Sequence, residues 1–277
     1  MENCLLTHYI FNKEVKSSCD FNQFELEKHQ GVYEVVKVIN GIPLFLEDHI
    51  SRLNNSLETY YLKPLLSLRQ IKTRIKALIE VNKLSSGNLK FHLLIHDNRK
   101  PDFYVWVSEY FYPTPLQYFI GVNCGLLDAV RDNPNSKTFK HRVRELADKY
   151  LKTNDEFEVI LRNQSGQISE GSRSNLFFIN KGVVFTSPDN MVLKGVTRQK
   201  VINICVRQKI KIEREVINMK TLPDYDSAFL SGTSINIIPI NTIESVRYNI
   251  NNELLTFLSD EYEKLVNEYL SNFNWNL

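Results

Sequence analysis

The sequence predicts a protein that mixes helices and strands and that breaks near residue 112. Its 277 residues exceed one average domain, so we expect one large domain or two modest ones. Stretches rich in β-branched and aromatic residues are separated by stretches whose apolar residues recur every three or four positions. The segment Tyr112-Pro-Thr-Pro-Leu116 places two prolines after an apolar strand-like run, which marks it as the candidate domain boundary.

Before this boundary the sequence predicts both strands and helices. Three stretches have strand-type composition: Val32–Val38, Leu89–Ile95 and Phe103–Tyr110. The first is followed by the turn signal Asn40-Gly41, and a polar turn over residues 97–101 joins the other two. Between the first strand and this pair we expect helices over residues 47–61 and 67–82, the second from the spacing of Ile71, Ile75, Leu78 and Ile79.

Beyond the boundary the same mixture continues. Helices are expected near residues 140–151, from about Thr197 onward, and near the C-terminus, where apolar residues are spaced for one packed face: Leu254, Leu255, Leu258, Tyr262, Leu265, Val266 and Tyr269. Strands are expected at Phe157–Leu161 and Asn175–Ile179, with turns at Gln164–Gln167 and Lys181-Gly182.

Composition and charge exclude several classes of protein. With 43% hydrophobic and 24% charged residues, the chain is typical of a soluble globular protein. Its formal net charge of +2 is too small for a dedicated nucleic-acid binder. The first residues lack the apolar core of a signal peptide, and no window approaches the roughly 20 apolar residues of a membrane span. The scattered cysteines (Cys4, Cys19, Cys124 and Cys205) form no CxxC pair, so we expect reduced thiols and a cytoplasmic location.

Three segments carry the chemistry of anion binding. In Leu193-Lys-Gly-Val-Thr-Arg198 a glycine precedes a helix, whose first N–H groups have no partner within the helix and carry about half a positive charge. Ser231-Gly-Thr-Ser234 offers hydroxyls and backbone amides in a turn. Arg52 can grip a phosphate through two parallel hydrogen bonds. Each segment also has a plainer interpretation: a glycine turn with Thr197 as the N-cap, a simple change of chain direction, and a solvent-facing arginine.

Glu170 is the candidate acidic residue. It follows a strand-like stretch and precedes a turn rich in Gly and Ser within Ile168–Phe177. Most glutamates in such a place are exposed, and a buried one would need a cationic partner. The histidines indicate no metal site, because His92 and His96 are four residues apart in a strand pattern and not in a helix.

Five segments, taken together and in order, resemble the class IV pyridoxal-phosphate aminotransferases: Gly31–Val38, Glu47–Leu53, Ser169–Phe177, Asn190–Arg198 and Ser231–Ser234. That family holds branched-chain aminotransferases, D-amino acid aminotransferases and aminodeoxychorismate lyases. The resemblance implies the α/β (α+β) fold type IV, with a small N-terminal domain over residues 1–114, a larger one over 115–277, and the cofactor between them. It also implies a homodimer that acts on small-molecule substrates, an amino acid and a 2-oxo acid.

The resemblance also implies roles for single residues. A lysine would hold pyridoxal 5'-phosphate as an imine and then move a proton, for which it must be neutral part of the time. Glu170 would pair with the ring nitrogen of the cofactor, and Tyr33 would be the active-site tyrosine. The other cofactor contacts would come from residues of the same motifs: Arg52, Ser174, Asn175, Leu193, Val196, Thr197, Thr233 and Ser234.

Two lysines compete for the covalent role, Lys137 and Lys140. Lys140-His141 matches a lysine–histidine pair of some lyase members. An ungapped match back from Phe157–Leu161 instead places Lys137 on the family's lysine and Leu146-Ala147 on its Leu-Ala pair. Using Lys140 would need a three-residue deletion in the helix, which turns its apolar face by about 300°. We therefore expect Lys137 to be the anchor, and the other cations to form a solvated helix face: Lys140, His141, Arg142, Arg144 and Lys149.

Three positions bear on the reaction. Arg173 stands where Ser or Ala is usual, so it would alter the contact with the cofactor ring or reach a substrate carboxylate. The loop His96–Pro101 lacks the Arg-x-His pair of D-amino acid aminotransferases, and Glu34-Val35 replaces the paired threonines of many lyase members. We expect a transaminase, with branched-chain amino acids among the candidate substrates. The alternatives are a lyase that releases pyruvate and 4-aminobenzoate from aminodeoxychorismate, and a non-catalytic homologue.

Overall fold

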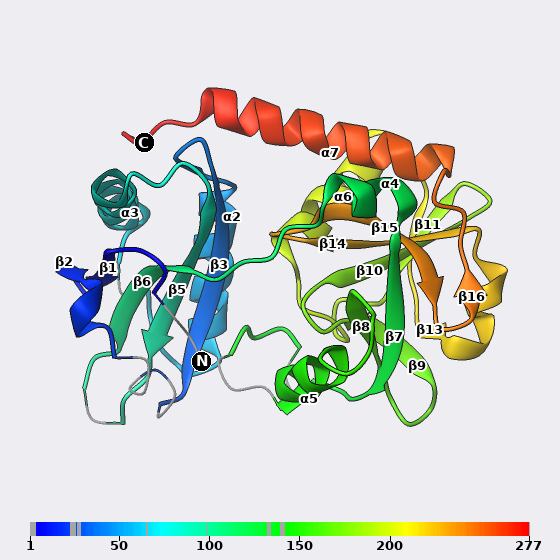
Figure 1. Cartoon of the computed structure of the whole chain (residues 1–277), viewed down its shortest axis with the longest axis horizontal. Coiled ribbons are helices and arrows are strands. Elements are labelled where there is room, and N and C mark those ends of the chain that lie inside the picture. The colour runs from blue at the N-terminus through cyan, green and yellow to red at the C-terminus, as the bar shows by residue number, and fades with distance from the viewer. Residues whose placement is uncertain are drawn as a thin grey trace. The chain divides into compact units, whose positions relative to one another are not determined.

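The computed structural model describes residues 4–22, 26, 29–64, 66–97, 99–131, 134–138 and 142–276. The chain forms two compact units, each with its own sheet and helices (Figure 1). Unit 1 comprises Met1–Phe111, Ser136–Lys140 and Val266–Leu277, and unit 2 comprises Tyr112–Asn135 and His141–Leu265. Neither unit is continuous in sequence. Folding domains with limits at 1–114 and 115–277 stay a prediction.

Unit 1 is built on a six-stranded antiparallel sheet with the order β2-β1-β6-β5-β3-β4. Its strands are β1 (His8–Phe11), β2 (Glu14–Ser17), β3 (Gly31–Ile39), β4 (Ile42–Pro43), β5 (Gly87–Leu94) and β6 (Asp102–Ser108). A short 3-10 turn, η1 (Ser18–Asp20), follows β2. Helices α2 (Leu46–Glu58) and α3 (Leu68–Asn82) bury their apolar stripes in one core with the sheet.

The faces of this sheet follow from the alternation of side chains along a strand. Val32, Val36 and Val38 of β3 point into the core that α2 and α3 complete. Tyr33 and its cross-strand partner His92 therefore lie on the opposite face. Glu34 has the parity of the core residues, so a carboxylate stands in the middle of an apolar strand face.

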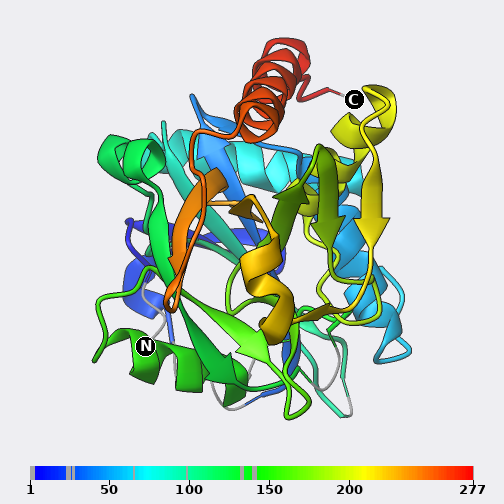
Figure 2. The ribbon, with the colours of Figure 1, turned by 90° about the vertical axis from the view of Figure 1, so that its right-hand side faces the viewer.

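Unit 2 contains a ten-stranded mixed sheet with the order β12-β11-β10-β14-β15-β7-β8-β9-β13, in which β16 pairs with β15 (Figure 2). Parallel pairs join β7 to β8, β7 to β15, and β11 to β12. The strands are β7 (Val122–Asp128), β8 (Glu158–Arg162), β9 (Gln167–Gly171), β10 (Asn175–Asn180), β11 (Val183–Thr186), β12 (Ile212–Arg214), β13 (Ile217–Asn218), β14 (Ser227–Gly232), β15 (Asn236–Ile243) and β16 (Val246–Arg247).

The helices of unit 2 are α4 (Pro115–Ile120), α5 (Arg142–Leu151) and α6 (Val196–Arg207), with a 3-10 turn η2 (Met219–Asp224). The C-terminal helix α7 (Glu253–Asn272) belongs to unit 2 as far as Leu265 and to unit 1 from Val266 onward. The core of unit 2 gathers apolar side chains of β7, β10, β14 and β15. No helix among the described residues is long and apolar enough to cross a membrane.

Most predicted elements are confirmed within one to three residues at each end. The helix predicted over 67–82 is α3, and Ser67 begins it with a capping box to Gln70. The two-proline segment is more than a linker, because Thr114 caps α4 and Pro115 is its first residue. Thr197 is not an N-cap, which corrects the plainer interpretation of that segment: Gly195 occupies the cap position of α6. Lys140 and His141 lie outside the described residues.

Candidate functional site

Unit 1 holds a buried polar cluster organised around the Glu34 carboxylate. Glu34 is fully buried, and Arg52 of α2 donates to both of its oxygens, from Nε to Oε1 and from Nη2 to Oε2, each over 2.7 Å. Such a bidentate contact fixes the plane of the guanidinium as well as its position. Burial works to raise the pKa of Glu34, but Arg52 and then Lys137 and His49 hold this pKa well below its usual range. The carboxylate is therefore an anion.

His49 is the second α2 residue on this carboxylate. Its Nδ1 lies 2.9 Å from Glu34 Oε2, and its ring is buried. Burial lowers the pKa of His49, so the neutral ring donates one hydrogen bond to Glu34 and adds no charge. His49 and Arg52 are three residues apart on a helix, which places both side chains on one face.

Lys137 reaches the same carboxylate from a different part of the chain. Its carbonyl accepts from the Tyr33 N–H over 2.9 Å, and its own N–H donates to Ser56 Oγ over 3.3 Å. The next residue, Thr138, forms a bridge with Val32. These contacts hold the segment along β3 and place Lys137 Nζ 3.8 Å from Glu34 Oε2. A lysine ammonium and an arginine guanidinium thus share one buried anion.

Two ammonium groups lie near the ring of Tyr33. Lys137 Nζ is 5.0 Å from the centre of its ring, and Lys90 Nζ of β5 is 5.1 Å from it. Both distances are in the range of cation–π attraction. Tyr33 and Lys90 are 6% and 4% exposed, so both interactions occur in a largely desolvated environment where they are stronger.

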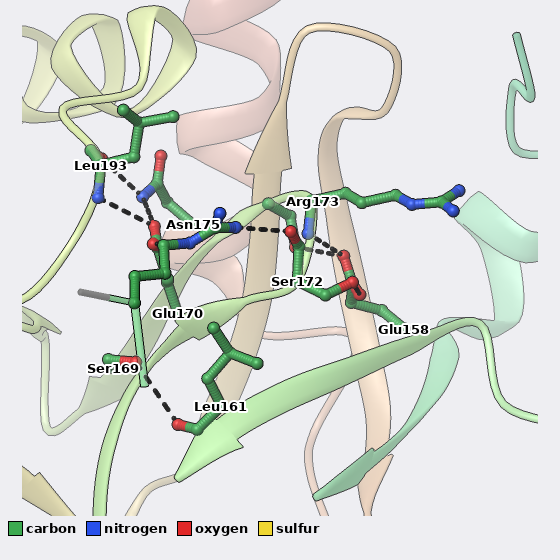
Figure 3. A network of polar contacts seen from close by, with 10 residues as sticks. Glu158, Leu161, Ser169, Glu170, Ser172, Arg173, Asn175 and Leu193 are labelled. Carbon is green, nitrogen blue, oxygen red and sulfur yellow. Dashed lines mark hydrogen bonds and ion pairs between the residues drawn. The ribbon is translucent and has the colours of Figure 1, made fainter. Parts of the chain in front are cut away.

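Unit 2 holds a separate polar cluster organised around Glu170 (Figure 3). Glu170 lies on β9 and is 2% exposed. Arg131 Nε donates to its Oε1 over 2.8 Å, while Asn175 Nδ2 and the Leu193 N–H donate to its Oε2 over 2.8 and 3.1 Å. Burial outweighs these partners and raises the pKa of Glu170 to about 7. Glu170 is therefore a buried carboxylate, and Arg131 is the cationic partner that a buried glutamate needs.

A second buried carboxylate, Glu158, shapes the turn after Glu170. It accepts hydrogen bonds from Ser172 Oγ, Ser174 Oγ and the Arg173 N–H over 2.6, 2.9 and 3.1 Å. The Arg173 side chain pairs with Asp148 of α5. Two residues with a predicted role in binding therefore have a protein partner in this structure. Ser174, the predicted cofactor contact, donates to Glu158, and Arg173, predicted to contact the cofactor ring or a substrate carboxylate, is paired with Asp148 of α5.

The N-terminus of α6 has the features of an anion cradle. Its N-cap is Gly195, so the cap has no side chain to bond the first amides, among them those of Val196 and Thr197. A Cβ on Gly195 would come within 2.0 Å of Asn175 Oδ1, so only glycine fits this approach. The Thr197 side chain is hydrogen-bonded to Tyr262 of α7, which leaves its backbone amide as the predicted anion donor.

The predicted turn residues Thr233 and Ser234 lie partly buried between β14 and β15. At the end of β14, Ser231 is fully buried, and its hydroxyl has no hydrogen-bond partner among the described residues. Ser231 pairs in register with Asn175. A buried hydroxyl without a partner is costly unless a ligand or water supplies one.

Sequence analysis did not identify four residues of these networks as site residues: His49, Lys90, Arg131 and Glu158. It used Glu34 only to favour a transaminase over a lyase. One signal in the sequence could have found Glu34. A charged residue that shares the parity of Val32 and Val36 in an alternating strand is predicted to be buried, and a buried carboxylate requires basic partners. Arg131 carries no such signal, because nothing near it in sequence indicates Glu170.

Comparison with known proteins identifies the family of the chain. The model of the amino-transferase class IV family matches residues 31–243, and the chain belongs to that family. It is accordingly an enzyme, and members of the family use pyridoxal 5'-phosphate. Among the described residues, no group of three or more His, Cys, Asp or Glu side chains could hold a metal ion.

Individual relatives have different activities. The chain is 26% identical to a D-alanine aminotransferase of Bacillus licheniformis, over 77% of this chain and 79% of the relative. It is 25% identical to an aminodeoxychorismate lyase of Bacillus subtilis, over 79% of each. The solved branched-chain amino acid aminotransferase of Escherichia coli superposes with a TM-score of 0.84 at 19% identity over 98% of each chain. The last comparison shows the shared fold type IV.

Proposed function

We propose that this enzyme is a pyridoxal-phosphate-dependent aminotransferase that moves an amino group between an amino acid and a 2-oxo acid, with Lys137 as its covalent anchor. One observation carries the proposal. The amine of Lys137 and the guanidinium of Arg52 converge on the buried Glu34 carboxylate, at 3.8 and 2.7 Å. An amine for the imine and a cation for the phosphate are the two groups that such a cofactor needs close together.

The remaining residues fit the cofactor's other groups. The uncapped amides of Val196 and Thr197, with the hydroxyl of Ser231, suit a phosphate. The predicted contacts of Thr233 and Ser234 belong to the same turn region. Glu170 suits a ring nitrogen, since an ionised carboxylate keeps a pyridine nitrogen protonated. Asn175 supports this role, because it donates to Glu170 and to the Leu193 carbonyl, each over 2.8 Å.

Pyridoxal phosphate, when bound, supplies an aldehyde that condenses with amines and a ring that accepts the electron pair released at the substrate carbon. The residues of this chain do the rest. Lys137 would hold the cofactor through its amine, and the same amine, when free, would accept and donate the proton that moves during amino transfer. Glu170 would keep the ring nitrogen charged, and Arg52 and the α6 amides each offer donors that would suit the phosphate. The Tyr33 ring contacts the Lys137 ammonium and restricts its direction.

For the substrate we propose a small or branched-chain amino acid. In place of an Arg-x-His pair, the loop after β5 has Arg99 and His96, and both are bound to Asp102 at 2.7 and 2.9 Å. Because both side chains are engaged by Asp102, we propose that the substrate is not a D-amino acid. We further propose that the protein is a homodimer and that it is located in the cytoplasm. Light scattering of the purified protein would test the dimer. The second candidate is aminodeoxychorismate lyase, because one relative has that activity.

Three measurements test the proposal. Purified protein with pyridoxal phosphate is expected to show the visible absorption of an imine, and borohydride reduction is expected to attach the pyridoxyl group to the peptide that contains Lys137. Lys137→Ala removes both signals, whereas Lys149→Ala, on the exposed face of α5, keeps them. A band that survives in Lys137→Ala refutes the assignment. Pyruvate released from aminodeoxychorismate without an amino acceptor would favour the lyase, and amino transfer in a panel of L- and D-amino acids favours the aminotransferase.

A further inference from the structure

Glu34 is the one charged side chain on the helix-facing side of β3. Val32, Val36 and Val38 share that side, and all of them, like Glu34, are 0% exposed. An isolated ionised carboxylate in such a place is strongly destabilising. A residue that served only the core would be apolar here. Its partners therefore indicate what the carboxylate does.

Among the described residues, the side chains bound to Glu34 are all basic, and they come from two separate segments. Arg52 and His49 approach from α2, and Lys137 approaches from the segment that runs along β3. His49 is neutral, since burial lowers its pKa, so the carboxylate faces two cations. Lys90 lies on the other face of the sheet, where its Nζ is 5.1 Å from the centre of the Tyr33 ring that Lys137 also contacts. Without Glu34, the charged forms of Lys137 and Arg52 would repel each other in a buried environment.

We propose that Glu34 is a positioning residue that holds the amine of Lys137 in place and keeps it charged beside Arg52. The inference rests on the proposed function, in which Lys137 is the cofactor lysine. The carboxylate acts through electrostatics: an opposite charge at about 4 Å stabilises the ammonium, and Arg52 alone would destabilise it. Glu34 thereby sets how readily Lys137 reacts as a nucleophile, because only the neutral amine attacks a carbonyl carbon.

The experiment measures the reactivity of Lys137 in cofactor-free protein. Trace acetic anhydride is applied at a series of pH values, and the acetylated fraction of the Lys137 peptide is read by mass spectrometry. In Glu34→Gln, which keeps the size of the side chain and removes its charge, we expect the midpoint of the pH profile to fall by about one to three pH units. Acetylation of Lys137 at neutral pH then rises at least about tenfold.

Two control variants separate charge from structure. Glu47→Gln also removes an α2 carboxylate from a buried lysine, since Glu47 lies 2.8 Å from Lys72 Nζ, and it is expected to leave the Lys137 midpoint unchanged. Glu34→Asp keeps the charge, so its midpoint is expected to remain nearer that of the wild type. A merely structural role would raise the maximal labelling of both Glu34 variants without moving either midpoint. That result, or a wild-type midpoint in Glu34→Gln, overturns the proposal.

If Glu34→Gln does not fold, as judged by near-UV circular dichroism, Arg52→Gln takes its place. Removing the guanidinium leaves Lys137, among the described residues, as the remaining cation on Glu34, so the midpoint of its pH profile is expected to rise. An unchanged midpoint in Arg52→Gln then overturns the proposal. These measurements use no cofactor, whereas failure of the borohydride labelling at Lys137 would overturn the proposed function alone.

Discussion

The partly exposed Arg131 and the buried Glu170 form an ion pair across 39 residues of sequence, with Arg131 Nε 2.8 Å from Glu170 Oε1. Arg131 Nη2 also donates to the Ser172 carbonyl over 2.5 Å, which ties the same guanidinium to the turn that follows β9. The pair supplies the cation that the buried carboxylate needs. It gives Glu170 a fixed position and a partly compensated charge.

Replacing Arg131 should weaken the binding of the cofactor. In Arg131→Gln the buried Glu170 loses its nearest cation, so its pKa is expected to rise further above about 7 and less of it is ionised at neutral pH. We expect the affinity for pyridoxal phosphate at pH 7 to fall about tenfold, as for a pKa rise of one unit, and to recover partly at pH 9. Fluorescence titration at both pH values measures this. Arg162→Gln, which breaks a more exposed pair with Asp128, is the control. Equal losses at both pH values would argue against the electrostatic explanation.

Glu170 should also make stability depend on pH. Because its folded-state pKa is raised from 4.5 to about 7, its contribution favours folding fully below pH 4.5 and is lost as the pH rises through 7. The rise corresponds to about 3 kcal/mol at most. We expect the free energy of unfolding of wild-type protein to fall relative to that of Glu170→Gln between pH 5 and 8, measured by urea denaturation without cofactor. A constant difference between the two proteins over this range would contradict the assignment.

Gly195→Ala should disturb both the anion cradle and Glu170. The new Cβ would lie 2.0 Å from Asn175 Oδ1, so Asn175 must move, and its hydrogen bonds to Glu170 and Leu193 are lost. Overpacking of this kind costs about 1–3 kcal/mol. We also expect the rise in melting temperature on adding inorganic phosphate to shrink. Gly232→Ala is the comparison, because its Cβ would meet the Ile235 side chain at 3.2 Å and the Arg173 carbonyl oxygen at 3.8 Å, with no contact as short as that of Gly195. Similar losses in the two variants would refute the specific contact.

Ser174→Ala distinguishes a cofactor contact from a structural one. In the structure Ser174 Oγ donates to the buried Glu158, so the variant is expected to lose about 1–2 kcal/mol of stability. We expect only a small change in affinity for pyridoxal phosphate once folding is allowed for. Ser169→Ala, whose hydroxyl makes a long 3.5 Å contact with the Leu161 carbonyl, should be nearly neutral. An affinity loss in Ser174→Ala with unchanged stability would restore the role that the family resemblance implies.

Local pattern predicted much of the fold. The apolar spacing of 67–82 and the strand composition of 32–38 correspond to α3 and β3, because periodicity and propensity act within a few residues. The elements that were missed are mainly short strands, such as β1 and β9, whose few residues carry little periodic signal. Glu170 was predicted as a site residue, but the sequence did not place it on a buried strand. It lies on β9 because β9 pairs with β8 and with the distant strand β13.

The sequence by itself determined the family, the order of the motifs and the kinds of elements that carry them, since each depends on residues close together in the chain. Tertiary structure alone decided which charges meet. Glu34 lies beside Lys137, Glu170 lies beside Arg131, and Arg173 turns to Asp148. The physical reason is that a buried charge is stabilised by whatever partner packing brings within a few ångströms, and packing joins residues that no local pattern relates.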